Sequence, residues 1–386
     1  MKLLNLKHDF KIIALSVFLG TLYGCGSETE SKITSHPTEV DMAIETAINN
    51  TIVLSVDDFS ENIEILNIEI DEFCTGAANT SKLTELQDAW SDSLISWYQL
   101  LPFNIGPMSF ADASTNQSSN LDFIDFYRNA TVVNQTSFLS STNANLNTLI
   151  ASSNPITETS LNNSSPQMIG LFTLETAIFD NLAGNSTSST DIVTDFNTES
   201  EKCDAIQAIG YELNRRAMSI QNQWTLDYRN KGVSYQTLFT KNLLEEYFTS
   251  LSDGEDASGT PASEATTVSI QEFLDFIGNA NIINELNRYN SDTIWLALTQ
   301  AIDTIEKLLD QRENTTLTLY AVMESNGYEQ DVQVIKANFN YIKEKISEKN
   351  IIDFEAAAKT LDGNFKTSVI NGLNINKGLT FADGDS

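Results

Sequence analysis

The stretch 80–101, TSKLTELQDAWSDSLISWYQLL, indicates the fold class of this chain. Its large apolar residues follow one another at intervals of three or four, so they lie on one face of an α-helix. Thr80 or Ser81 can cap the start of this helix, and Pro102 can stop it. The stretch therefore predicts a helix of about six turns. Its apolar face consists of Leu83, Leu86, Trp90, Leu94, Trp97 and Leu101.

The same spacing recurs along the rest of the chain. The chain has only 6 Pro and 17 Gly in 386 residues, which favours long helices over a turn-rich β architecture. We therefore expect an all-α fold of antiparallel helical bundles. Long helices are expected at 201–226, 292–309 and 332–346, and shorter ones near 39–56, 166–181, 236–251, 268–288 and 353–369.

Two polar stretches suggest where the chain divides. Residues 181–200 are rich in Ser, Thr, Asn and Asp, and we take them as the boundary between two domains. This gives an N-terminal bundle at 38–190 and a C-terminal bundle at 191–386. Residues 252–266 have the same composition, and we expect a loop there inside the second bundle.

Composition and charge exclude several classes of function. Hydrophobic residues make up 41% of the chain, which is enough for a core and excludes wholesale disorder. The 53 acidic residues against 22 basic ones give a net charge of -31, which repels phosphate backbones, so we expect no nucleic-acid partner. The two histidines, His8 and His36, both lie near the N-terminus. Their position argues against histidine-based catalysis and against a zinc site built from several histidines.

The first 24 residues are typical of an export signal. Three lysines precede a short apolar run at 12–19, which is too short to span a membrane. The segment ends in LYGC (22–25), which resembles a bacterial lipobox. We therefore expect a lipoprotein signal peptide at 1–24 and a lipid on Cys25. The alternative is an ordinary cleaved signal that ends beside a cysteine.

The residues after Cys25 bear on where the protein is anchored. Residue 26 is Gly rather than the Asp that, by analogy with enterobacterial lipoproteins, holds a lipoprotein at the inner membrane. We therefore expect an outer-membrane lipoprotein in the cell envelope, facing the periplasm or the cell surface, with the membrane as a partner through the lipid. The stretch 25–37 is polar and has no periodicity, so it is interpreted as a tether.

The two remaining cysteines, Cys74 and Cys203, would be exported together. Unpaired thiols are uncommon in an oxidising compartment, so we expect a disulfide between them. Closing this long loop would stabilise the fold by on the order of 5 kcal/mol in the chain-entropy account. The alternative is two separate buried thiols.

A chemically unusual segment is IGLFTLETAIF (169–179). The helix that it predicts is apolar almost all round and should be buried, yet Glu175 lies at its middle. A buried carboxylate costs several kcal/mol unless it is paired, hydrogen-bonded or bound to a metal. Arg215 or Arg216 could supply the pairing charge. The alternative is a lone glutamate that faces solvent at the seam of the helix.

Four stretches of the chain form one ordered pattern: 86–97 followed by FNIGP (103–107), GLFTLE (170–175), the expected helix over 203–224, and TFADGD (380–385). Together they resemble the imelysin family, which comprises exported bacterial proteins originally named for a metallopeptidase and often tied to iron uptake. The first stretch is similar to the family's first Trp helix and its Phe-x-x-Gly-Pro turn. GLFTLE lies where the family has Gly-x-His-x-x-Glu, and 203–224 is similar to the helix after that motif. TFADGD is similar to the C-terminal Phe-x-x-x-Asp-Gly-Asp ending, with one spacer fewer.

The resemblance implies two packed helical bundles, with the motif helix near the cleft between them. It also identifies Gly170 and Glu175 as motif residues that bind a ligand, and it places Phe172 at the position of the family's histidine. Phenylalanine cannot ligate a metal, so a zinc-peptidase mechanism would lack its imidazole. A hard cation such as Ca²⁺ or Fe³⁺ could still be held by oxygen ligands, with Glu175 and the tail carboxylates Asp383 and Asp385 as candidates. The alternative for the tail is a solvated acidic end.

Three hypotheses about function follow. The first is a lipid-anchored, non-catalytic binding protein of the cell envelope, linked to iron or metal uptake through an ion, a chelate or a partner protein. The second is a metallopeptidase with a rearranged site, whose turnover would be lost in Glu175→Ala. The third is an envelope scaffold or interaction protein whose acidic surface serves solubility. Iron and calcium are the cofactors considered, and no residue is assigned a catalytic role.

Overall fold

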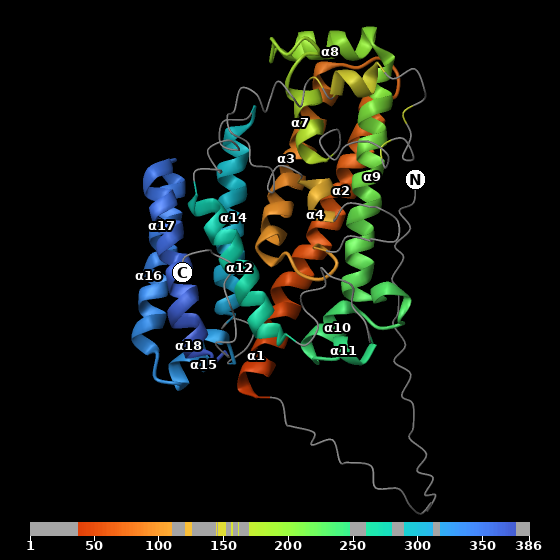
Figure 1. Ribbon diagram of the computed structural model, residues 1–386. Coiled ribbons are helices and arrows are strands. Elements are labelled where there is room, and N and C mark those ends of the chain that lie inside the picture. Colours follow the sequence, from red (N-terminus) through yellow and green to blue (C-terminus); the bar gives the residue numbers. More distant parts are fainter. Residues whose placement is uncertain are drawn as a thin grey trace, which may run out of the picture. The chain divides into compact units, whose positions relative to one another are not determined.

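The described part of the chain is built from helices, and it contains no strand (Figure 1). The computed structural model describes residues 38–109, 120–125, 144, 146–151, 156, 161, 170–247, 260–279, 289–311 and 317–375, apart from the side chains of residues 122, 245 and 246. These residues belong to one compact unit. The expected all-α helical bundle is confirmed. In these ranges, no helix combines the length and the apolar character that crossing a bilayer requires.

The four long periodic patterns correspond to four long helices. In α3 (Thr80–Leu100) the expected apolar face is fully buried, and Leu83, Trp90 and Trp97 are each 0% exposed. Its cap is Asn79 rather than Thr80 or Ser81, because the Asn79 Oδ1 accepts hydrogen bonds from the backbone N–H groups of the second and third helical residues. The four helices are α3 (Thr80–Leu100), α9 (Ser200–Thr225), α14 (Ser291–Leu309) and α16 (Glu329–Ser347).

The long helices pack side by side. Helix α2 (Val53–Cys74) packs between α3 and α9, and α3 also packs against α14 (Figure 1). Helix α16 contacts α14, and α17 (Ile351–Asn364) lies between α16 and α12 (Ala262–Gly278). The core is therefore continuous from α9 through α2, α3 and α14 to the C-terminal helices.

Two of the helices run on through π-helical turns. Helix α1 (Glu39–Ala47) passes through η1 (Ile48–Ile52) directly into α2, so the pattern near 39–56 marks only the first part of a longer helical rod. In the same way, α17 passes through η6 (Phe365–Val369) into α18 (Ile370–Gly372). The remaining elements are the 3-10 turns η2 (Leu101–Phe103) and η5 (Tyr228–Asn230) and the short helices α4 (Asn120–Ile124), α7 (Leu171–Phe179), α8 (Ser189–Thr198), α10 (Tyr235–Thr240), α11 (Leu244–Tyr247) and α15 (Leu319–Ser325).

Both polar stretches contain helix that their composition concealed. The stretch 181–200 includes α8, which buries Ile192 and Phe196 four residues apart on one face. Two apolar contacts are enough to hold a short helix against α3 and α9. The expected loop at 252–266 is wrong in its last part, because α12 begins at Ala262 and buries small polar residues there.

Helices α2 and α9 are antiparallel neighbours. Gln207 Nε2 donates to Asp71 Oδ1 near the end of α2, and Gln221 Nε2 donates to Asp57 Oδ1 near its start, each over 2.9 Å. Helix α9 lies after residue 190 in sequence and packs against α2, which lies before it. The division into bundles at 38–190 and 191–386 stays a prediction.

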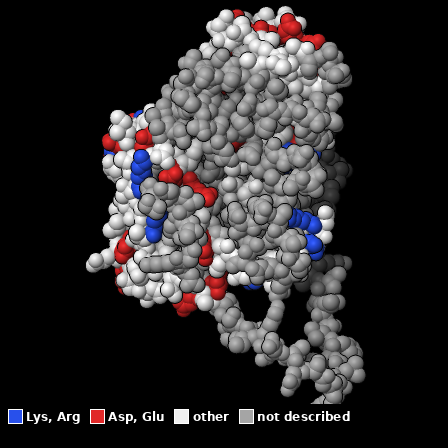
Figure 2. Space-filling view, viewed as in Figure 1, with Lys and Arg blue, Asp and Glu red and all other residues white. Residues whose placement is uncertain are grey.

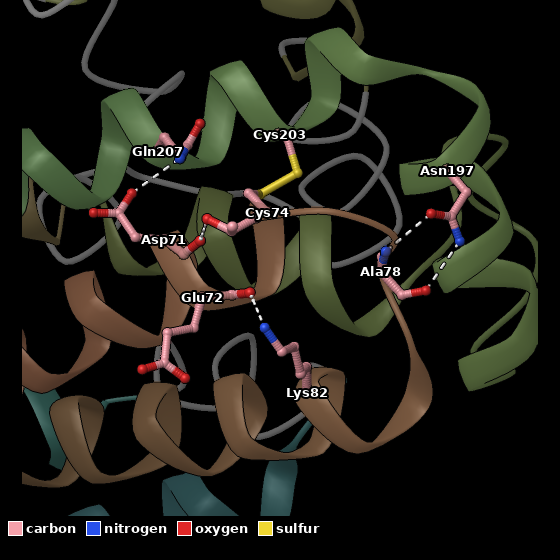
Figure 3. The surroundings of a disulfide bond; sticks show 9 residues. Asp71, Glu72, Cys74, Ala78, Lys82, Asn197, Cys203 and Gln207 are labelled. Carbon is pink, nitrogen blue, oxygen red and sulfur yellow. Dashed lines mark hydrogen bonds between the residues drawn. A yellow bond between two sulfur atoms is a disulfide. The ribbon is translucent and has the colours of Figure 1, made fainter.

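The expected disulfide between Cys74 and Cys203 is present, and it joins the end of α2 to the start of α9 (Figure 3). The same end is held by a two-way amide contact, in which Asn197 of α8 accepts from the N–H of Ala78 and donates to its carbonyl oxygen. Lys82 of α3 donates to the backbone carbonyl of Glu72. These contacts join the ends of α2, α3, α8 and α9. On the surface of the molecule, acidic side chains gather where α8 lies (Figure 2).

Candidate functional site

The motif helix α7 begins at a glycine that no other residue can replace without strain. Gly170 has φ +93°, and a Cβ built there would lie 2.6 Å from the carbonyl oxygen of Phe123 and 2.7 Å from that of Ile124. Both distances are shorter than real Cβ contacts, and both obstacles are backbone. The glycine therefore lets the start of α7 lie directly against α4.

Helix α4 is also where the Phe-x-x-Gly-Pro turn and α9 meet. Asn120 Nδ2 donates to the carbonyl oxygen of Pro107 over 2.8 Å, and Arg216 Nη1 of α9 donates to Asn120 Oδ1 over 3.2 Å. The Arg216 guanidinium also stacks over the Phe123 ring, 3.6 Å from its centroid. Three of the stretches that resemble the family therefore converge on one short helix.

Arg215 and Arg216, the two candidates for pairing with Glu175, both bind the carboxylate of Glu212. Glu212 is 0% exposed and accepts hydrogen bonds from Arg215 Nε over 2.7 Å and from Arg216 Nε over 2.8 Å. Burial lowers the pKa of the Arg216 guanidinium, and the neighbouring Glu212 opposes that change. We did not single out Glu212 from the sequence, although its spacing of three and four residues from the two arginines is a signal for such pairs.

Glu175 is fully buried, which confirms the burial predicted for its helix and rules out a solvent-facing glutamate. Its Oε1 accepts a hydrogen bond from the backbone N–H of Asn290 over 3.3 Å. Asn290 is the N-cap of α14, and its own side-chain oxygen accepts from Thr293 N. A carboxylate at the N-terminus of a 19-residue helix is stabilised by the partial positive charge there. Glu175 thus joins α7 to the start of α14.

Helix α3 holds α7 at both of its ends. Trp90 Nε1 donates to the carbonyl oxygen of Leu171 over 2.8 Å, and Gln87 Nε2 donates to that of Ile178 over 2.7 Å. The Trp90 ring also packs edge-on against Phe179 at 5.2 Å between centroids. The helical spacing predicts that Trp90 is buried, and the structure adds this hydrogen bond to the backbone of α7.

Further buried polar groups lie next to the motif, and the sequence gave little reason to single them out. Asp125 is 1% exposed, and its Oδ2 accepts from the indole N–H of Trp97 over 3.1 Å. Asp180 directly follows α7, and its Oδ2 accepts from the hydroxyl of Tyr289 over 2.7 Å. Each carboxylate lies against an aromatic donor from a distant part of the chain, which no local spacing can predict.

The first turn of α9 carries a lysine that is 0% exposed. Lys202 Nζ lies 3.9 Å from Asp195 Oδ2 and 4.2 Å from the centroid of the Phe196 ring. Burial lowers the pKa of Lys202 to about 8, against the opposing effect of Asp195 and Asp180. Because its ammonium group is closed off from solvent and lies against Asp195 and Phe196, we interpret Lys202 as structural.

The motif does not fit a metal of the zinc-peptidase type. Phe172, at the position that the resemblance assigns to the histidine, is 1% exposed and packs in the core. Across the described ranges, no three His, Cys, Asp or Glu side chains are grouped so that they could hold a metal ion. Cys25 and the tail carboxylates Asp383 and Asp385 lie outside the described residues, so lipidation and an oxygen-only site shared by Glu175 and the tail stay predictions.

The comparisons with known proteins agree with this architecture. The sequence model of the imelysin family, peptidase family M75, matches residues 54–375. The fold is similar to the crystal structure of an imelysin-like protein from Psychrobacter arcticum 273-4, with a TM-score of 0.63 and 15% identity over 88% of this chain and 97% of that chain. It is also similar to a protein described as an iron-regulated protein A precursor from Parabacteroides distasonis ATCC 8503, with a TM-score of 0.58 and 13% identity over the same shares of the two chains. No curated protein matches the sequence.

Proposed function

The chain belongs to the imelysin family, and from this premise we propose that it is a lipid-anchored, non-catalytic binding component of the cell envelope that takes part in iron or metal uptake. The family's link to export and iron supports the location and the general role. The described fold also resembles that of a precursor described as iron-regulated. The ligand is an ion, a chelate or a partner protein.

The non-catalytic part of the proposal rests on the two motif side chains of α7, Phe172 and Glu175, both of which are buried. Glu175 uses one carboxylate oxygen to accept from the N-cap residue of α14, and Phe172 fills the core where an imidazole would be needed. A catalytic zinc site needs three protein ligands and an open position for water. The motif therefore supports a role in joining helices more readily than a role in hydrolysis.

The experiment that tests this proposal combines metal content with hydrolysis. The purified full-length protein and Glu175→Ala are dialysed at about 0.15 M salt, because a net charge of -31 attracts cations diffusely at low salt. Iron, calcium and zinc are then measured by elemental analysis, and peptide hydrolysis is followed with and without chelator. Glu61→Ala, an exposed position on α2, serves as the matched control.

We expect no hydrolysis in any of these proteins. Turnover that a chelator abolishes and that Glu175→Ala loses would overturn the proposal in favour of a metallopeptidase with a rearranged site. Stoichiometric metal that is lost only in Glu175→Ala, without turnover, would support direct ion binding at the motif. No metal in any variant would leave a chelate or a partner protein as the ligand.

The link to iron and the anchor have separate tests. Cells that lack the protein should grow more slowly when iron is limiting and normally when it is abundant, and equal growth in both media would contradict a role in iron uptake. The wild-type protein should incorporate labelled palmitate and sediment with membranes, and Cys25→Ala should do neither. Incorporation of label by Cys25→Ala would contradict the proposed lipidation site.

A further inference from the structure

A cavity of about 690 Å³ lies between the starts of α1 and α12 and the ends of α15 and α18. Among the described residues, its lining includes none from α4, α7 or α9. Its volume falls within the roughly 300–1,000 Å³ that small-molecule sites occupy in proteins. The cavity is therefore separate from the site described above and large enough for an organic ligand.

The charge around this cavity has one sign. Glu39, Asp41 and Glu264 line it, and no Lys, Arg or His does so among its described lining residues. Asp41 is used in the cap of α1, where it accepts hydrogen bonds from the N–H and the hydroxyl of Thr38. In the described part of the chain, Glu39 and Glu264 form no ion pair. Two carboxylates therefore remain for a cationic ligand.

Ser263 provides a second and independent indication of a ligand. It is 7% exposed and lines the cavity, and its hydroxyl makes no hydrogen bond to any described residue. A ligand in the cavity would supply the hydrogen bond that this hydroxyl lacks within the protein. The buried apolar residues Leu373 and Ile375 form part of the same lining and supply surface for hydrocarbon.

We propose that this cavity binds a small organic cation, an aliphatic polyamine in which methylene groups separate primary ammonium groups. A directly coordinated metal fits less well, because no three His, Cys, Asp or Glu side chains are grouped for a metal within the described ranges. In the polyamine, the ammonium groups pair with Glu39 and Glu264, one of them donates to the Ser263 hydroxyl, and the methylene chain lies over Leu373 and Ile375. The proposal is independent of the function proposed for the motif helix.

The test is isothermal titration calorimetry of spermidine into the full-length protein at about 0.15 M NaCl. We expect saturable binding at one site, which the double variant Glu39→Gln/Glu264→Gln weakens at least 10-fold. The matched control is Glu61→Gln/Glu64→Gln, which removes two charges from exposed positions on α2 and should change the affinity less than 2-fold. Hexane-1,6-diol, which carries no charge, should not bind measurably.

Several outcomes would overturn the proposal. Binding that never saturates, or an equal loss in the two double variants, would show diffuse attraction to an acidic protein. Ser263→Ala keeps every charge and should lower the affinity about 3- to 10-fold, and unchanged affinity would remove Ser263 from the site. Thermal melting of each variant without ligand checks the fold, and metal content at the motif should not change in any of them.

Discussion

Two regions of α9 hold buried charge in different ways. In its first turn, Lys202 lies 3.9 Å from Asp195 and makes no hydrogen bond through Nζ to any described residue. Three turns further on, Glu212 accepts hydrogen bonds from both Arg215 and Arg216. In the first region, the ammonium group of Lys202 is incompletely paired, and the Cys74–Cys203 disulfide lies beside it. In the second region, the carboxylate of Glu212 is paired with two guanidinium groups through hydrogen bonds, and no disulfide is involved. We infer that the disulfide stabilises the region of α9 whose buried charge is less completely paired.

Removing the disulfide should have the largest effect. Replacing both cysteines, Cys74→Ser with Cys203→Ser, frees two residues that are 129 positions apart and should lower the free energy of unfolding by up to about 5 kcal/mol. Urea unfolding of the purified protein measures this loss. Reduction of the wild-type protein should reproduce it. A loss below about 1 kcal/mol would contradict the comparison, because the region around Lys202 would then be stable without its covalent link.

The second prediction breaks the hydrogen-bonded region instead. Glu212→Ala leaves the Arg216 guanidinium buried without its carboxylate and should cost about 3–5 kcal/mol. Urea unfolding is again the measurement, and Glu61→Ala on the surface of α2 should change stability by less than about 0.5 kcal/mol. Adding Arg216→Met to Glu212→Ala should recover part of the loss. If it recovers nothing, the unpaired charge is not the cause.

The third prediction concerns the contact between α7 and α4, which the Arg216 region supports. Gly170→Ala places a Cβ against two backbone carbonyl oxygens at a positive φ and should cost about 2–4 kcal/mol. Gly76→Ala is the matched control, because Gly76 has φ +86° but no atom within 4 Å of the added Cβ, so only the strain of about 1–2 kcal/mol applies. Equal losses in thermal or urea unfolding would show that α4 moves freely away from α7.

The fourth and smallest effect should be a gain. Lys202→Met removes a buried charge and should raise stability at pH 7 by about 1–3 kcal/mol. The pKa of Lys202 is about 8 in the folded protein and 10.5 in the unfolded chain, so the unfolded chain binds more protons between these values. The wild-type protein should therefore gain stability from this group as pH rises from 8 to 10.5. Urea unfolding at several pH values should show this rise in the wild-type protein and not in Lys202→Met. If Lys202→Met is less stable than the wild-type protein at pH 7, our interpretation of Lys202 is wrong.

The parts of the fold that the sequence predicts are those decided by local spacing. The buried face of α3 follows from residues three and four apart, and the buried position of Glu175 follows from its apolar neighbours in α7. The pairing of Cys74 with Cys203 follows from the compartment and the cysteine count rather than from spacing. Each of these inferences needs only one stretch of sequence, or a count.

The contacts around the candidate site depend on helices far apart in sequence, and the sequence does not predict them. The sequence offers Arg215 or Arg216 as possible partners of Glu175, whereas the N-cap residue of α14, which donates to Glu175, lies 115 residues away. Lys202 had no distinguishing pattern, because its burial depends on α8, whose composition concealed a helix. Glu212 shows an intermediate case, because its spacing to the two arginines was visible but its burial was not.

The π-helical turn η1 has a consequence for the rod that α1 and α2 form. A π-turn holds one residue more than a regular helical turn, so it takes up that residue without turning the helices on its two sides away from each other. In a regular helix the same extra residue would rotate α1 by about 100° relative to α2. The π-turn therefore keeps the buried residues of α1 (Ala43, Ile44 and Ala47) and those of α2 (Val56, Phe59 and Ile63) on neighbouring sides of one rod. Deleting one residue between 48 and 52 should leave a regular helix with both apolar faces still buried.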